Sequence, residues 1–278
     1  MKKHIVYIIF FCFNLYPLGF DALYIPSNPT LMSLSGSGLA SRAINSLNPA
    51  SNISKDTYIS FSNNRWTEDI KGNSFYYVIN GFQFDYYGLG VDDIELRNDI
   101  PSDDPLDIIE SHFLSFGVSK GYNIFEKFKV GFGVNFNYSQ LFTDKLSALT
   151  LDFGVQKSLS DNFQLGMMIK NLTTHIEVPK ILGIGMSYYN LKTKSEMLLD
   201  FQYSKENNSG IGIHAGLIQP IKMFTFNLGY SKYSNARTTI SSGVEIDIGN
   251  NYKFLYSILS LQETNLGLAH YFGIQFSL

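Results

Sequence analysis

The sequence predicts an all-β protein: a transmembrane antiparallel β-barrel of about 14 strands with a short N-terminal plug or helical segment. The first observation is residues 127–139, where every even position is apolar or aromatic and every odd position is polar or glycine. Successive side chains of a strand point to opposite faces, so this stretch has one apolar and one polar face. It is also longer than a soluble strand of about 5–6 residues and suits a strand tilted across a bilayer, which needs roughly 9–11.

The second observation is that this alternation recurs to the end of the chain. We expect strands at 57–66, 73–80, 81–90, 110–121, 127–139, 146–157, 163–169, 180–190, 195–204, 210–219, 223–231, 239–249, 252–261 and 265–278. An even number lets the first and last strands pair antiparallel and leaves no open edge. Closure is needed in lipid, where an unpaired backbone group costs several kcal/mol.

The third observation is that the connections fall into two sets. One set is tight and includes Asn80-Gly81, 123–126 and 160–162, whereas the other includes the long stretches Val91–Ile109 and Asn171–Pro179. Short turns on one side and longer loops on the other are typical of outer-membrane barrels. The sequence therefore predicts a bacterial outer-membrane location with lipid as a partner. A soluble multi-strand sandwich is the alternative.

Composition agrees with a barrel. Charged residues are 16% and aromatic residues 15% of the chain, with 18 Tyr and 23 Phe. High Phe and Tyr content suits aromatic girdles at the two membrane interfaces. The formal net charge of -3 offers no basic surface for phosphate backbones, so nucleic acid is excluded as a partner.

Residues 1–22 have the features of a secretory signal peptide. Lys2 and Lys3 precede an apolar core from Ile5 to Leu15, and cleavage is expected after Gly19 or Ala22. An N-terminal membrane anchor is the competing interpretation. The only cysteine, Cys12, lies in the apolar core, so the mature chain would have no disulfide.

Residues 23–56 lack the period-2 pattern and precede a barrel domain of residues 57–278. Residues 39–47 could form a short helix, and 48–52 should form a turn because proline restricts the residue before it. The segment is expected either to plug the lumen or to lie as a loose tail on the periplasmic side. Its candidate plug residues are Arg42, Asn48, Pro49 and Ala50.

Polar side chains on the strands mark a candidate lumen surface. They are Asp85, Asp152, Lys170, Asp200, Glu245 and Asp247. Ordinary lumen polarity is the simpler explanation, and a permeation or ligand site is the alternative. Glu245 and Asp247 could hold a cation, but they lack the ligand spacing of an EF-hand loop.

The acidic stretch between the third and fourth strands is a candidate outer docking loop, because long loops on rigid scaffolds often carry function. Its residues are Asp92, Asp93, Glu95, Asp103 and Asp104. A solvated loop without further function is the alternative.

We expect no catalytic residue, no cofactor and no metal site. The mature histidines do not form an i, i+2 pair on one strand face. Gly131-x-Gly133 and Gly183-x-Gly185 lie within strands rather than before a helix, so they do not form phosphate loops. Glycines on a lumen face are better explained by strand curvature or the close approach of a plug.

Several stretches resemble the PorV/PorQ family of outer-membrane proteins, relatives of FadL-type fatty-acid transporters. The N-terminal stretches are Ser41-Arg42-Ala43, Asn48-Pro49-Ala50 and 87–95, and the later ones are 168–172, 178–185 and Ala269-His270-Tyr271-Phe272-Gly273-Ile274. The resemblance covers nearly all of the mature chain, although the N-terminal segment lacks the family's glycine-rich run.

The resemblance implies a 14-stranded barrel with an N-terminal segment near or in the lumen. It also implies a type IX secretion accessory or cargo-binding protein, whose partners would be secreted proteins with C-terminal sorting domains or other secretion components. A FadL-like channel for small hydrophobic molecules and a purely structural barrel are the alternatives, because fold does not determine function.

Overall fold

The computed structural model describes residues 19–43, 47–53, 56–66, 70–97, 104–175, 178–205, 210–234, 238–261 and 268–278. Expectations that fall on the remaining positions lie outside the described residues. These include the signal peptide up to residue 18 and Asp103. No helix among the described residues is long and apolar enough to cross a membrane.

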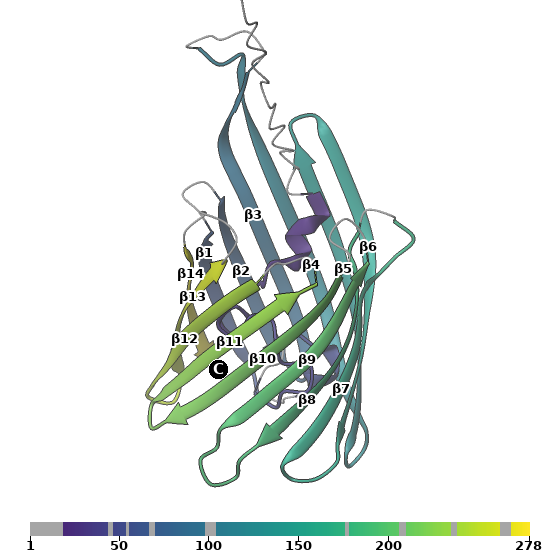
Figure 1. The fold of residues 1–278 in the computed structure, drawn as a ribbon, viewed down its shortest axis with the longest axis vertical. Helices are drawn as coiled ribbons and strands as arrows, with labels where there is room; N and C mark the ends of the chain where they lie inside the picture. The colour runs from purple at the N-terminus through teal and green to yellow at the C-terminus, as the bar shows by residue number, and fades with distance from the viewer. Residues whose placement is uncertain are drawn as a thin grey trace, which may run out of the picture.

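Fourteen antiparallel strands close into one barrel, in which each strand pairs with its sequence neighbours and β1 pairs with β14 (Figure 1). The predicted fold class and strand number are therefore confirmed. The strands are β1 Tyr58–Arg65, β2 Ile70–Ile79, β3 Phe82–Leu96, β4 Asp107–Phe125, β5 Phe128–Leu141, β6 Asp144–Ser158, β7 Phe163–Leu172, β8 Lys180–Tyr189, β9 Glu196–Lys205, β10 Gly210–Ile221, β11 Phe224–Tyr233, β12 Thr238–Ile248, β13 Tyr252–Leu261 and β14 Leu268–Ser277.

The alternation of the sequence decides which side chains face outward. On β5, Phe132, Val134 and Phe136 are 49%, 45% and 46% exposed, whereas the next residue, Asn137, is fully buried. The apolar face thus forms the outer surface of the barrel, and the polar face lines the lumen. This arrangement is that of a barrel whose solvent is lipid.

The tight connections that the sequence indicated lie at one end, although the opposite end also has one two-residue turn, between Leu141 and Asp144. Short turns such as Asn80-Gly81 join the strands at one end, called here the short-turn end, where β1 begins and β14 finishes. Asn80 and Gly81 have φ of 50° and 75°, the left-handed geometry that a tight hairpin turn requires. The opposite end is called the long-loop end.

The loop between the third and fourth strands is shorter than the expected range from Val91 to Ile109. β3 continues to Leu96 and β4 begins at Asp107, so this hairpin rises beyond its neighbours at the long-loop end (Figure 1). A β-bulge between Val91 and Ile94 lets the pairing resume past the acidic residues. The polar composition therefore marks strands that leave the apolar zone, not a loop.

The N-terminal segment, residues 19–43 and 47–53, lies inside the barrel. It contains a 3-10 helix η1 (Gly19–Tyr24), a short helix α1 (Pro29–Ser33) and a 3-10 turn η2 (Pro49–Ser51). Asn28 caps α1 through the amide of Leu31, and Pro29 occupies its first turn. The helix expected at 39–47 is absent from its described residues, which form a turn at 39–40 and bends at 42–43 because their backbone groups bond to the barrel wall.

Candidate functional site: the plugged lumen

Two carboxylates on β9 hold the middle of the N-terminal segment. Asp200 Oδ2 accepts hydrogen bonds from the backbone amides of Gly38 and Leu39, at 2.6 and 3.0 Å. Glu196 accepts from the Ser41 hydroxyl at 2.9 Å and from the Arg42 amide at 3.0 Å. Charged acceptors make stronger hydrogen bonds than neutral ones, so this pair is the strongest tether that the described contacts show.

Further contacts fix the segment to other parts of the wall. Glu245 on β12 accepts from the Thr30 hydroxyl at 2.8 Å, and His214 on β10 donates to the carbonyl of Ser35 at 2.7 Å. On β14, Tyr271 donates its hydroxyl to the carbonyl of Pro26 at 2.7 Å. Contacts with β9, β10, β12 and β14 hold the segment across the lumen rather than against one side.

Asn48 is the center of a second attachment. Its side-chain nitrogen donates to the carbonyls of Leu39, Val155 and Met167 at 2.9, 3.3 and 3.2 Å, and its oxygen accepts from the Ala50 amide at 3.0 Å. One buried amide therefore joins two parts of the segment to β6 and β7. Asn48 is also the N-cap of η2.

Glycines on the inner wall allow the segment to approach this closely. A Cβ atom at Gly131 would overlap with the backbone of Pro49 and Ala50, and one at Gly166 would overlap with the carbonyl of Leu39. This agrees with the sequence-based interpretation of lumen glycines as sites of close plug approach. Gly133 differs, because its nearest neighbours are the Cβ atoms of Ser119 and Asp152 on the barrel itself.

The predicted plug residues all lie in the segment. Asn48, Pro49 and Ala50 are buried between β4, β5 and β6. Arg42 is exposed toward the short-turn end, where its guanidinium donates to the carbonyl of Ser160 at 3.4 Å and lies over the Tyr189 ring.

The six candidate lumen residues lie on the inward face of the wall but do not form one site. Asp152 accepts from the Asn171 amide and the Asn135 side chain, at 2.8 and 3.0 Å. Asp200 and Glu245 bind the segment, and the Lys253 ammonium lies 3.1 Å from Glu245 and 3.7 Å from Asp247. The sequence left open whether Glu245 and Asp247 hold a cation. The ammonium group of Lys253 supplies the positive charge beside these two carboxylates. Asp85 and Lys170 are partly buried elsewhere in the lumen.

The acidic residues of the expected docking loop are spread over the extended hairpin. Asp92 lies on β3 at the outer surface, and Asp93 occupies the bulge with a φ of 59°. Glu95 pairs with Arg97 at 2.7 Å, and Asp104 is exposed beyond the strand. The hairpin extension thus separates residues that were expected to lie in one loop.

One group near this hairpin was missed. The ligand atoms of Asp92, Glu110 and His112 lie within 4.8 Å of one another on the outer surface of β3 and β4, and His112 Nε2 is 3.0 Å from Glu110. The expectation of no metal site rested on the spacing of histidines, whereas this group has one histidine between two carboxylates. His112 and Glu110 contact each other, and all three side chains are at least partly exposed, so the group by itself does not define a metal site.

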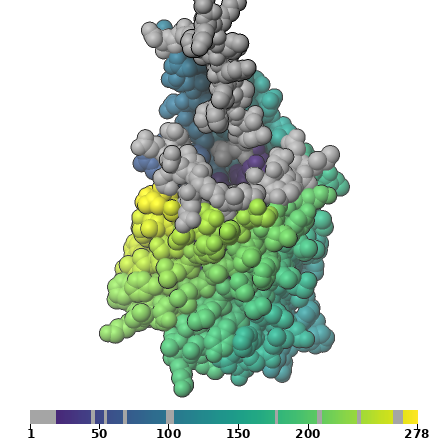
Figure 2. All heavy atoms as spheres, viewed as in Figure 1, coloured from purple at the N-terminus to yellow at the C-terminus, as the bar shows by residue number. Residues whose placement is uncertain are grey.

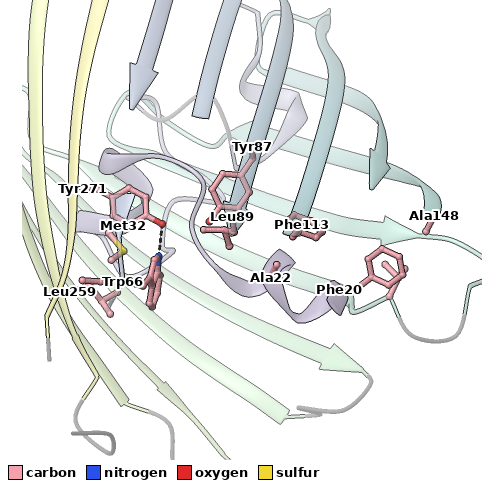
Figure 3. Close-up of a cluster of buried hydrophobic side chains, with 12 residues drawn as sticks. Phe20, Ala22, Met32, Trp66, Tyr87, Leu89, Phe113, Ala148, Leu259 and Tyr271 are labelled. Carbon is pink, nitrogen blue, oxygen red and sulfur yellow. Dashed lines mark hydrogen bonds between the residues drawn. The ribbon is translucent and has the colours of Figure 1, made fainter. Parts of the chain in front are cut away.

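An apolar cluster that was not predicted lies within the lumen, near the long-loop end (Figure 3). Its wall residues include Trp66, Leu89, Phe113 and Leu259, and η1 adds Phe20. Trp66 Nε1 donates to the Tyr271 hydroxyl at 2.9 Å, as the dashed line in Figure 3 shows. Barrel lumens are generally polar, so an apolar interior at one end is a distinctive feature. The signal was available as Trp66, Leu89, Phe113 and Leu259 on the otherwise polar faces of their strands.

Two cavities lie on opposite sides of the segment. A cavity of about 690 Å³ at the short-turn end is lined by polar and charged residues that include Thr30, Glu196, Glu245 and Lys253. A smaller cavity of about 100 Å³, called here the apolar cavity, lies toward the long-loop end, and nine apolar side chains line it together with polar ones such as Lys170, Gln202 and His214. Its apolar residues are Leu23, Ile25, Pro26, Leu31, Leu47, Trp66, Met168, Ile181 and Leu259. In Figure 2, purple residues of the N-terminal segment are visible inside the rim at the upper end.

Fold and lumen together define a class: a closed 14-stranded barrel whose own N-terminal segment fills its interior between an apolar and a polar cavity. No protein-family model matches the sequence, and no curated protein does so significantly.

Solved structures share this fold. The toluene transporter TbuX of Ralstonia pickettii superposes with a TM-score of 0.63 and 12% identity, covering 90% of this chain and 97% of TbuX. The Pseudomonas putida toluene transporter TodX gives 0.62 and 11%, covering 90% and 96%. A FadL homologue of Pseudomonas aeruginosa gives 0.55 and 9%, covering 91% and 97%. The chain thus has the fold of FadL-like barrels, whereas the PorV/PorQ branch stays a prediction.

Proposed function

We propose that this protein is a bacterial outer-membrane channel that takes up small hydrophobic molecules through its lumen. The observation that carries the proposal is the apolar cavity between the N-terminal segment and the wall at the long-loop end. Its apolar residues, which include Trp66, Met168 and Leu259, stand beside polar groups that can orient a ligand. An engineered apolar cavity of about 150 Å³ holds benzene. The toluene channels of the same fold support this direction.

The position of Phe20 adds to the argument. Its ring packs in the apolar cluster and meets the His175 ring edge-on, with centroids 5.6 Å apart. If the signal peptide is removed after Ala22, this ring leaves the lumen, and the mature protein has an additional space of one aromatic ring beside the cavity. A flat aromatic or a short alkyl chain would suit this shape.

For a ligand to pass through the lumen, part of the N-terminal segment must move. The segment separates the apolar cavity from the polar cavity, and hydrogen bonds to Asp200, Glu196 and Glu245 hold it in place. We infer that a ligand first binds in the apolar cavity and reaches the short-turn end when part of the segment moves. The short-turn end would face the periplasm in this orientation.

The single tryptophan gives a direct test. Trp66 is the only Trp in the chain and lines the apolar cavity, so its fluorescence reports on ligand entry. Titration of toluene or a medium-chain fatty acid into the detergent-solubilised protein should quench or shift this emission with saturation. A linear, non-saturating response would contradict a binding site.

Neighbouring methionines supply matched variants. Met168 faces the cavity and is buried, whereas Met167 faces outward and is 55% exposed. Met168→Phe should fill the cavity and weaken the saturable response at least about tenfold, because overpacking and lost space cost roughly 1–3 kcal/mol. Met167→Phe should leave the response unchanged. Equal effects of the two substitutions would place the ligand elsewhere.

Type IX secretion remains the second proposed function, and it rests on the family resemblance in the sequence. A pull-down of the membrane protein separates the two. Recovery of secreted proteins that share one C-terminal domain would favour cargo binding, whereas saturable hydrophobic binding without such proteins favours the channel.

A further inference from the structure

The outer surface formed by β14 and β1–β4 changes from apolar to cationic toward the long-loop end. Phe61, Phe75 and Tyr86 lie directly opposite one another on β1, β2 and β3 and form an apolar row. Two residues nearer the long-loop end, Asn63 pairs with Asn73. Two residues further, Arg65 lies between His270 and Lys71. At about 3.3 Å per residue, the change takes roughly 13 Å along β1.

This order matches the layers of a lipid leaflet. Aromatic and aliphatic side chains face acyl chains, amides suit the ester or sugar oxygens, and arginine and lysine suit phosphates. Elsewhere the apolar surface continues, since on β5 it runs from Val130 through Phe136 to the partly buried Tyr138. The apolar surface thus stops early over β1 and β2.

A groove lies at this place on the outer wall. Its volume is about 240 Å³, and its lining includes Asn63, Lys71, Asn73, Tyr86, Asp92 and His112. Gly88 and Gly90 form its floor on the outward face of β3, opposite Asn73 and Lys71. Because neither glycine carries a side chain, the wall is hollowed where its neighbours present hydrogen-bond donors.

The cations beside the groove lie close to one another. Arg65 and Lys71 are directly opposite on neighbouring strands and face the same side, a placement in which like charges repel. Asp92 lines the groove, and Glu110 lies within 4.8 Å of Asp92, so both carboxylates offset part of this charge. Glu68 and Asp69 belong to the connection outside the described residues. A bound phosphate would bridge the two cations.

We propose that this groove binds the phosphorylated headgroup of a membrane lipid. Arg65 and Lys71 bind the phosphate, Asn63 and Asn73 bind the adjoining polar oxygens, and Phe61, Phe75 and Tyr86 contact the acyl chains. A lipid fits better than free phosphate because the groove lies on the outer wall directly next to the apolar row. The inference shares with the proposed channel only the placement in a membrane, and it goes beyond transport.

The test is native mass spectrometry of the full chain, purified in neutral detergent with EDTA to remove bridging cations. The probes are diphosphorylated lipid A, the same lipid after removal of both phosphates, and inorganic phosphate. We expect retention of the phosphorylated lipid only. Because a basic residue near the headgroups contributes about 1 kcal/mol, Arg65→Gln with Lys71→Gln should weaken retention about thirtyfold.

The chain offers a matched control in Lys180 and Lys205. These lysines are also directly opposite on the outward face near the long-loop end, on β8 and β9, and away from the groove. The double change Lys180→Gln and Lys205→Gln should leave retention unchanged. An equal loss of lipid retention in both double variants would show that general surface charge causes the effect. That result would overturn the proposal.

Other results would also overturn it: equal retention of the dephosphorylated lipid, or displacement of the lipid by inorganic phosphate. A heat-dependent gel shift checks that each variant is folded. If the double variant fails this check, Lys71→Gln alone is used, with an expected loss of about fivefold. Trp66 titration with toluene on the same samples shows separately whether hydrocarbon binding, the basis of the channel proposal, is present.

Discussion

Asp200 and Leu39 are joined by a hydrogen bond in which the Leu39 amide donates to the Asp200 carboxylate at 3.0 Å. The amide of Gly38 donates to the same oxygen at 2.6 Å. One side chain of the wall thus holds two consecutive amides of the N-terminal segment in the middle of the lumen.

We predict that Asp200→Ala loosens the segment. Hydrogen bonds to charged groups contribute roughly 1.5–3 kcal/mol each, so the loss of both should weaken the docking of the segment by about 3–6 kcal/mol. Planar-bilayer recordings should show a larger or more frequent open current than for the wild type. Asp247→Ala is the control, because Asp247 pairs with Lys253 near the short-turn end, and its current should match the wild type. Equal currents for both variants would contradict the tether.

Gly131→Ala should displace the segment from β5. Its Cβ would overlap with the backbone of Pro49 and Ala50, and overpacking costs typically about 1–3 kcal/mol. Limited trypsin digestion after Arg42 should become faster. Gly133→Ala, two residues along the same face, meets only the Cβ atoms of Ser119 and Asp152 at 3.3 Å and should change the rate much less. Similar rates for the two variants would show that the segment tolerates a methyl group here.

The two faces of β5 should respond differently to a charge. Val134→Lys places an ammonium on the outward apolar face and should cost about 2–4 kcal/mol if the site lies at the membrane midplane. Asn135→Lys faces the lumen, where Asn135 lies 3.0 Å from the Asp152 carboxylate, and should be much milder. Urea unfolding in lipid vesicles measures both. Equal destabilisation would mean that the face assignment is wrong.

The mature N-terminus should be residue 20 or residue 23, as mass spectrometry of the purified protein would show. With Leu23 first, the Phe20 ring is absent, and saturable hydrocarbon binding should be stronger than in a chain that begins at Phe20. Two engineered chains with these starting points provide the comparison. Weaker hydrocarbon binding in the chain that begins at Leu23 would contradict the idea that a ligand occupies the space of the Phe20 ring.

Much of the fold could be predicted because a barrel wall is a local pattern. In β5, the alternation of residues such as Val134 and Asn135 determines which side chains face outward and which face the lumen. The Asn80-Gly81 pair determines the position of a tight turn. The end of a strand is harder, because backbone pairing continues beyond the apolar residues. Asp92 and Glu95 lie on an extended β3 for this reason, where composition indicated a loop.

The candidate site could be predicted only in part. The glycines at 131 and 183 indicated a close neighbour, but nothing local in the sequence says that Pro49 and Leu39 are those neighbours. Trp66 and Phe113 are far apart in the chain and meet only when the barrel closes. The helix expected at 39–47 failed because the bonds of Leu39 to Asp200 and Gln156 replace helical bonds.

The closed β1–β14 seam has a consequence for how the molecule is made. Residues 58–65 pair with residues 270–277, so the last strand to be synthesised completes the ring. Inside the barrel, Tyr271 on β14 donates to the Pro26 carbonyl, and Gly131 on β5 lies against the backbone of Pro49 and Ala50. These contacts are complete only in the closed ring, so we expect closure of the seam and docking of the segment to depend on each other.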